Sequence, residues 1–244
     1  MKKLFGSLFI IAFLFSSCIN TDENISITLK FTQNWNAEPV TNQDFNEFKF
    51  TTENGTKVSV ERLRYLVSNI SIIGDTNHSL IDVGENSETL LTINNLTPGS
   101  YKLKFVFGFQ DADNTDGIYQ DLNTASFNVP GMLGGGYHYM QFDGKYKNSS
   151  NQDSNFNYHT IRAVDRTNPA NLILEDTSFE VDLGTVIITN NAEIEIKMNI
   201  AEWFKNPNTW DLNELNTVLM PNFEAQKMMS ENGRSVFSLG DINQ

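Results

Sequence analysis

The chain has 244 residues, of which 30 are acidic and 17 are basic, and its formal net charge is −13. Such an acidic protein is poorly suited to bind nucleic acids or anionic lipid headgroups, and it is compatible with cations or with a basic protein partner. The length suits one large β domain or two small ones. A single cysteine allows no internal disulfide, so the apolar core must stabilise the fold alone.

The N-terminus has the composition of a bacterial secretory signal. Lys2 and Lys3 precede an apolar run over residues 4–15, which is too short to span a bilayer. Two serines follow, and then comes Cys18, the only cysteine of the chain. A cysteine directly after small residues resembles a lipobox, in which this cysteine is acylated. The alternative is a cysteine that stands there by chance.

We therefore predict a lipoprotein signal peptide over residues 1–17, a lipidated tether over 18–24 and a single domain over 25–244. Multiple acylation at Cys18 anchors a protein stably to a membrane without spanning it. The predicted location is the bacterial cell envelope, at the outer membrane, facing the periplasm or the cell surface. The acidic pair in the tether resembles the export signals of Bacteroidetes-type surface lipoproteins.

Strand patterns cover most of the remaining chain. Apolar residues that alternate with polar ones, or that form continuous runs, predict strands over residues 25–31, 45–52, 57–60, 63–73, 101–109 and 193–200. Asn54-Gly55 marks a tight hairpin between the second and third of these. The segment 63–73 is apolar on both faces, which is typical of a central strand that is covered on both sides.

Helical patterns are confined to two short segments. One is a turn around residues 201–205, and the other spans 222–232 and is predicted to stop at Gly233. Strands at regular spacing with turns between them predict an all-β fold, an antiparallel, Greek-key-like β-sandwich with a short C-terminal helix.

Two of the three histidines stand in matching contexts, each directly after a tyrosine in a strand-like run: His138 and His159. Neutral imidazole is a common ligand of borderline metals, and Met140 is expected on the same strand face as His138. In an antiparallel pair with His138 opposite His159, the residue numbers sum to 297 and residues 144–153 form the loop. The alternative is two structural histidines without a metal.

Other segments give weaker signals. Residues 111–117 resemble a calcium loop, but the glycine is misplaced and the bidentate glutamate is missing, so a solvated loop is predicted. The glycines at 134–136 precede a strand, which favours close backbone approach at a sheet edge. His78 stands in a polar turn and is expected to be solvated. The sequence contains no nucleophile elbow and no His-Glu-x-x-His motif, so the protein is predicted not to be an enzyme.

Several segments together resemble the MbnP-like family of copper-binding periplasmic or lipid-anchored proteins. They keep the family's order and spacing across nearly the whole chain: residues 31–40, 60–70, 134–145, 157–163 and 198–212. The resemblance implies a β-rich domain that is paired with a MauG-type di-haem peroxidase. That partner oxidises a tryptophan to kynurenine, which then helps to bind copper together with histidines.

Carried over residue by residue, the resemblance makes Trp35 the oxidised residue and His138 and His159 the copper ligands. Trp35 follows the first strand among polar residues, and a structural loop tryptophan is the alternative. Two imidazoles, a neutral nitrogen and a thioether from Met140 would suit Cu(I), with no organic cofactor. Gln33 departs from the family pattern, which often has a histidine at this place, and its amide is a poorer ligand for a soft metal.

Two functions from different classes follow. The first is a non-enzymatic copper-binding lipoprotein that is the substrate of a di-haem peroxidase. The second is a cell-surface binding or adhesion module that recognises a glycan or a protein without a metal. The tryptophans at 203 and 210 are expected to pack in the core, so only Trp35 is expected to be accessible.

Overall fold

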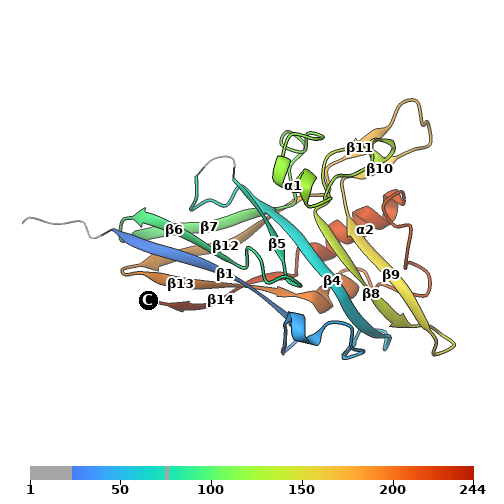
Figure 1. Cartoon of the computed structure of the whole chain (residues 1–244), viewed down its shortest axis with the longest axis horizontal. Helices are drawn as coiled ribbons and strands as arrows, with labels where there is room; N and C mark the ends of the chain where they lie inside the picture. Colours follow the sequence, from blue (N-terminus) through green and yellow to red (C-terminus); the bar gives the residue numbers. More distant parts are fainter. Residues whose placement is uncertain (1–23, 75–76) are drawn as a thin grey trace, which may run out of the picture.

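The computed structural model describes residues 24–74 and 77–244. The predicted signal peptide, Cys18 and all but the last residue of the tether lie outside the described residues. The molecule is elongated, with the start of β1 and the C-terminus at one end and α2, β9, β10 and β11 at the other (Figure 1). In the described part of the chain, no helix has the length and apolar character that crossing a membrane requires.

The described residues form strands, two α-helices and three short 3-10 helices (η). Their bounds are β1 (Ile25–Trp35), β2 (Glu38–Val40), η1 (Asn42–Asp44), β3 (Phe50–Thr51), β4 (Lys57–Ser68), β5 (His78–Asp82), β6 (Leu90–Leu96), β7 (Gly99–Phe107), α1 (Gln120–Thr124), η2 (Gly131–Leu133), β8 (Met140–Lys147), β9 (Asp153–Thr160), β10 (Ala163–Asp165), β11 (Ile173–Glu175), β12 (Phe179–Ile188), β13 (Ala192–Asn199), η3 (Ile200–Phe204), α2 (Phe223–Gly233) and β14 (Phe237–Asn243).

Two sheets and a small β10–β11 pair make up the fold. The first sheet has the order β14-β13-β1-β2, with β6 also paired to β1. The second has the order β12-β7-β4-β8-β9, with β3 and β5 paired to β4. The prediction of a mainly antiparallel β fold with a short C-terminal helix is confirmed. One pair departs from it, because β1 and β13 run parallel.

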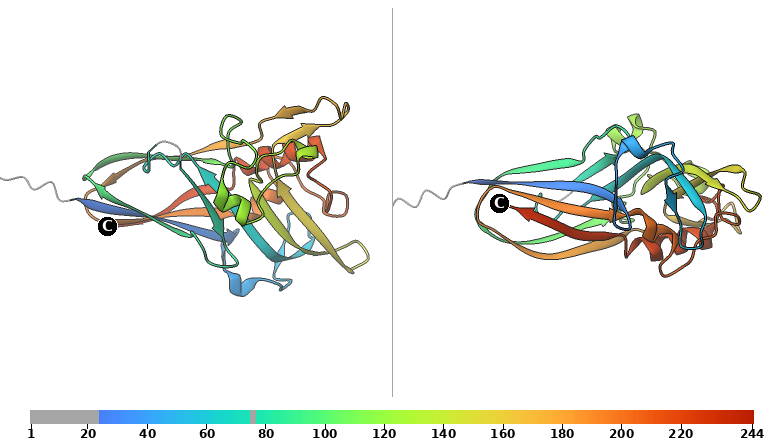
Figure 2. Two further views of the ribbon diagram at one scale, coloured as in Figure 1. Left: turned by 45° about the horizontal axis from the view of Figure 1, so that its top comes forward. Right: turned by 90° about the horizontal axis from the view of Figure 1, so that it is seen from below.

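The two sheets pack face to face through one aromatic core (Figure 2). Alternate residues of β1 point into it, and Phe31 of β1 packs edge-on against Phe105 of β7 at a centroid distance of 6.1 Å. The central position of β4 is confirmed, since Tyr65 lies in the main core while Leu66 lies in a second cluster on the other face. That cluster also contains Phe127 and holds the segment between β7 and β8 against β4.

The C-terminal helix α2 begins after Asn222, whose side chain caps it by accepting a hydrogen bond from the Ala225 amide at 3.1 Å. Gly233 is the last helical residue, and its role differs from the predicted helix stop. A β-carbon at Gly233 would lie 2.5 Å from Phe179 and 2.8 Å from Trp203, so this glycine is required for close packing. Trp203 and Trp210 are fully buried, as predicted.

Candidate metal centre

His138 and His159 meet on the outer face of the β8–β9 hairpin. Their ring centroids lie 5.3 Å apart, with the rings nearly perpendicular. The predicted register was wrong, because His159 lies opposite Gln141, three residues away from the predicted pairing. The loop is tighter than predicted and spans only residues 148–152. A bend at Tyr139, just before β8, turns His138 onto the face that carries His159.

His138 holds an unpaired nitrogen in a buried environment. Its Nδ1 lies 2.9 Å from the Phe127 carbonyl oxygen, and because a carbonyl only accepts, Nδ1 must carry the proton. The Nε2 atom then presents a lone pair, and it has no hydrogen-bond partner among the described residues. Burial lowers the pKa of His138 from 6.5 to about 4, so the ring is neutral at physiological pH.

His159 is oriented by a carboxylate. Its Nε2 lies 2.7 Å from Oδ1 of Asp143, the neighbouring acidic residue on β8. Burial raises the pKa of Asp143, but hydrogen bonds from His159 and Asn157 outweigh this effect and hold the pKa below its ordinary value. The carboxylate accepts a hydrogen bond from Nε2–H of His159, so in the one-proton form of this ring the lone pair is on Nδ1. Each ring of the histidine pair therefore offers one nitrogen to a metal.

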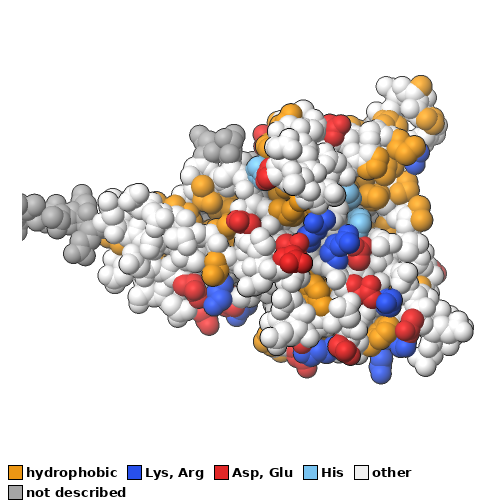
Figure 3. Space-filling view, viewed as in Figure 1, with side chains coloured by type: hydrophobic (Ala, Val, Ile, Leu, Met, Phe, Trp, Pro, Cys, Tyr) orange, Lys and Arg blue, Asp and Glu red, His pale blue; other side chains and the backbone are white. Residues whose placement is uncertain are grey.

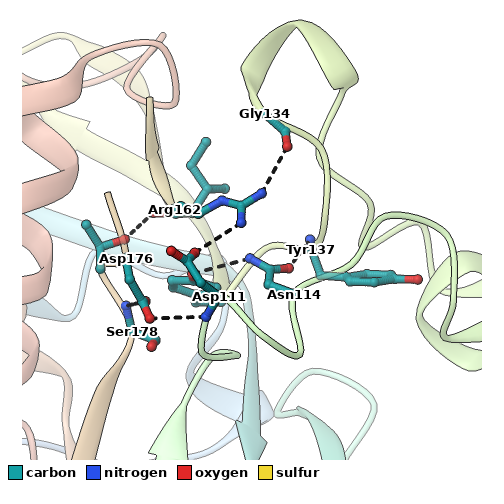
Figure 4. Close-up of polar contacts among 10 residues, drawn as sticks. Asp111, Asn114, Gly134, Tyr137, Arg162, Asp176 and Ser178 are labelled. Atoms are coloured by element: carbon teal, nitrogen blue, oxygen red, sulfur yellow. Dashed lines mark hydrogen bonds and ion pairs between the residues drawn. The ribbon is translucent and has the colours of Figure 1, made fainter. Parts of the chain in front are cut away.

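Tight backbone packing positions the strand entry that carries His138. Gly136 has a φ of +79°, and a β-carbon there would lie 2.4 Å from Oδ1 of Asn114, so the predicted close approach is confirmed. The same Oδ1 accepts a hydrogen bond from the Tyr137 amide at 2.8 Å (Figure 4). The prediction of a solvated loop over residues 111–117 was wrong at this point, because Asn114 is buried and supports the glycine segment.

An ionic network holds this glycine segment from the other side (Figure 4). The guanidinium of Arg162 donates to Oδ1 of Asp111 at 3.0 Å and to the Gly134 carbonyl at 3.0 Å. The carboxylate of Asp176 accepts from the Asp111 amide at 3.1 Å and from the Ser178 amide at 2.8 Å. The segment that leads into His138 is thus fixed by side chains from β9–β12 and their connections.

The rim of the histidine pair is charged and faces solvent. Arg62 lies 3.2 Å from Oδ2 of Asp143, and Arg64 donates a hydrogen bond to Gln141. These arginines and Gln141 line a cleft of about 480 Å³ beside the pair. The surface shows histidine atoms next to basic and acidic side chains (Figure 3). An ion could therefore approach His159 from solvent, since its side chain is 15% exposed.

Trp35 lies apart from the pair, inside the main core. It is the last residue of β1 and is only 5% exposed, so the prediction of an accessible loop tryptophan was wrong. Its ring stacks on Phe50 at 5.0 Å and on Phe204 at 5.7 Å, and Nε1 donates to the Thr51 carbonyl at 3.0 Å. Phe204 also contacts Tyr158, which points to the face of β9 opposite His159. The sheet therefore separates Trp35 from the histidine pair.

Gln33 and Met140 also lie on the core side. Gln33 is buried, donates to the Tyr65 hydroxyl at 3.0 Å and lines a cleft of about 630 Å³ along β1, away from the pair. Met140 pairs across from Thr160 and is fully buried in the main core. The bend that brings His138 to His159 leaves Met140 on the other face. Of the residues that the sequence analysis assigned to the copper site, the structure therefore brings together only His138 and His159.

His78 begins β5 and is engaged with neighbouring side chains, so the prediction of a solvated side chain in a turn was wrong. Its Nε2 lies 2.8 Å from Oδ2 of Asp121, and its ring packs on Tyr119 at 4.7 Å. These contacts fasten α1 to the edge of the sheet and place His78 in a separate cluster.

Sequence reasoning missed Asp143 and the Phe127 carbonyl, which set the tautomers of the two rings. Strand alternation places Asp143 on the same face as Gln141, so the carboxylate could have been found once the register was known. In the part of the chain that the structure describes, no group of three or more His, Cys, Asp or Glu side chains is arranged to hold a metal ion. The candidate centre is therefore a pair of imidazoles with an open coordination sphere.

The metal-free protein is expected to lose stability as the pH falls from about 6.5 to about 4. The pKa of His138 is about 4 in the folded protein and 6.5 without burial. The unfolded chain therefore takes up a proton in this window before the folded protein does. At about 1.4 kcal/mol per pKa unit, the effect is on the order of 3 kcal/mol. Urea unfolding of the wild type and of His138→Gln measures it, and equal pH dependence in both would contradict the burial argument.

The fold and the site define a mainly β, two-sheet domain with a pair of adjacent histidines on its outer face. A family model described as MbnP matches residues 24–221, and the chain belongs to the MbnP family. Among solved structures, MbnP from Methylosinus trichosporium is similar at 10% sequence identity, over 78% of this chain and 80% of that chain, with a TM-score of 0.47. The search of curated proteins finds no match.

Proposed function

We propose that this protein binds copper at His138 and His159, as a non-enzymatic metal-binding protein. The observation that carries the proposal is the buried Nε2 of His138, which has no hydrogen-bond partner in the described part of the chain and lies beside a second imidazole. A buried polar atom without a partner is destabilising, and a metal ion would satisfy it. Membership of the MbnP family supports copper as the metal.

The donor set fits copper. In each ring one nitrogen is held by a hydrogen-bond acceptor and the other is left for a metal, and imidazole is a good ligand for copper. The site would take Cu(I), for which we expect few ligands and no carboxylate in direct contact. Titration of the metal-free protein with Cu(I) against a chromogenic chelator tests the proposal, with a stoichiometry of one copper per chain as the expected result.

We further propose that Trp35 is the substrate of a MauG-type di-haem peroxidase. Cleavage of the indole C2–C3 bond by two peroxide equivalents inserts two oxygen atoms and releases two waters. Hydrolysis of the resulting N-formyl group then releases formate and leaves kynurenine. Among the tryptophans, Trp35 adjoins the surface, because the four residues after it are exposed. In this proposal the modification is separate from the histidine pair, since the β8–β9 sheet lies between them.

The protein is proposed to be held at the outer membrane by acylated Cys18. The β8–β9 hairpin, which carries the histidine pair on its outer face, lies away from the end of the molecule where β1 begins (Figure 1). A tether at this end would leave the pair facing away from the membrane.

Cys18→Ala is expected to release the protein from membranes. The substitution removes the proposed site of acylation, and with it the acyl chains that would anchor the protein. Fractionation of cells that produce the full chain measures the effect, with Ser17→Ala as the matched control. Retention of the Cys18→Ala protein in the membrane fraction would rule out the lipid anchor.

A further inference from the structure

We infer that Asp143 is a positioning residue, which selects Nδ1 of His159 as the nitrogen that faces the metal. The carboxylate is fixed on three sides. Its Oδ1 accepts from His159 Nε2 at 2.7 Å and from Asn157 Nδ2 at 2.7 Å, and its Oδ2 lies 3.2 Å from Nη1 of Arg62. Both oxygens are engaged, so the carboxylate cannot turn away from the ring without breaking these contacts.

The backbone at His159 is fixed as well. Its carbonyl accepts a hydrogen bond from Nε2 of Gln226 at 2.9 Å, and Oε1 of the same amide accepts from the Ile161 amide at 2.8 Å. Gln226 is buried in α2 and therefore ties the end of β9 to the helix. With its backbone held by α2 and Nε2 held by Asp143, the imidazole has one free nitrogen, Nδ1.

The two rings of the pair are consequently held in opposite tautomers. His138 keeps its proton on Nδ1, because that atom faces the Phe127 carbonyl, and His159 keeps its proton on Nε2, because that atom faces Asp143. A carboxylate behind a ligating histidine fixes the tautomer and raises the basicity of the ligating nitrogen. Metal binding by Nδ1 of His159 depends on the proposed function, whereas the tautomers are a property of the metal-free protein.

The first test is long-range proton–nitrogen NMR of the imidazoles in the metal-free full chain, above the ordinary imidazole pKa of about 6.5. The wild type should show His159 with its proton on Nε2 and His138 with its proton on Nδ1. Asp143→Leu should leave His159 as a mixture of tautomers and His138 unchanged. Asp153→Leu makes the same change on the same hairpin, at an exposed carboxylate that pairs with Lys147, and should alter neither ring.

Asp143→Asn is the conservative variant. In the wild type, the side chains of His159 and Asn157 both donate to Oδ1 of Asp143. The side-chain oxygen of the Asp143→Asn protein should take the place of Oδ1 and keep the proton of His159 on Nε2. A wild-type His159 protonated on Nδ1 would overturn the inference. So would an Asp143→Leu protein in which His159 remains entirely protonated on Nε2. The wild-type and Asp143→Asn spectra decide the matter even where Asp143→Leu does not fold.

The second test is the affinity for Cu(I), measured anaerobically against a competing chelator. Loss of such a supporting carboxylate weakens metal binding by roughly 10–100-fold, which is the effect expected for Asp143→Leu. Asp143→Asn should lose less, and Asp153→Leu should bind as the wild type does. Unchanged affinity for Cu(I) in Asp143→Leu would overturn the inference that Asp143 supports metal binding by His159. Absence of Cu(I) binding in the wild type would instead contradict the proposed function, while the NMR result would still test the positioning role.

Discussion

Copper binding is expected to disappear when either histidine of the pair is replaced, in His138→Ala and in His159→Ala. Each ring supplies one of the two nitrogens, and a single remaining imidazole leaves most of the coordination sphere unfilled. His78→Ala is the matched control, because His78 is engaged with Asp121 in a separate cluster. Met140→Leu should also retain binding, since the thioether lies in the core on the other face of the sheet. Competition with a Cu(I) chelator measures all four variants.

Comparison of the four variants decides whether copper binds at the histidine pair. Equal loss of copper in all three histidine variants would indicate adventitious chelation at the surface. Loss of copper in Met140→Leu, with the fold intact by circular dichroism, would contradict the assignment of the site to the outer face of the β8–β9 hairpin.

Oxidation by a di-haem peroxidase is expected to convert Trp35 completely and to leave Trp203 and Trp210 as tryptophan. Trp35 ends β1 beside four exposed residues, whereas the other two indoles are fully buried. Protein made alone in a heterologous host should carry three unmodified tryptophans. Peptide mass spectrometry detects kynurenine, because it contains one carbon less and one oxygen more than tryptophan.

The same samples test the separation of Trp35 from the histidine pair. Because the β8–β9 sheet lies between them, the modified and unmodified proteins should have the same affinity for Cu(I). Oxidation spread over all the tryptophans would contradict the choice of Trp35. A strong gain in affinity on modification would show that kynurenine joins the copper site, against the geometry described above.

The sequence was sufficient for the local features of the fold. Alternating apolar residues predicted β1, and a segment that is apolar on both faces predicted the central position of β4. The helix near the C-terminus and the burial of Trp203 were also predicted from residue type. These features depend on residues that are neighbours along the chain, so they can be predicted from a single sequence.

Features that depend on distant contacts could not be predicted in this way. The parallel pairing of β1 with β13 joins segments that are far apart in the chain. The bend at Tyr139 follows a glycine segment that packs against the distant residue Asn114, and it changes which residues share a face with His138. Strand alternation alone therefore grouped Met140 with the histidine and missed Asp143. The polar neighbours of Trp35 suggested exposure, yet the indole packs between Phe50 and Phe204.

X-ray absorption spectroscopy of the Cu(I)-loaded wild-type protein at the copper K-edge identifies the atoms that surround the metal. We expect nitrogen scattering with the outer-shell pattern of two imidazole rings per copper and no sulfur scattering, because His138 and His159 meet on the outer face while Met140 stays in the core. A spectrum with a sulfur neighbour, or one without two imidazoles, would contradict copper binding at the histidine pair.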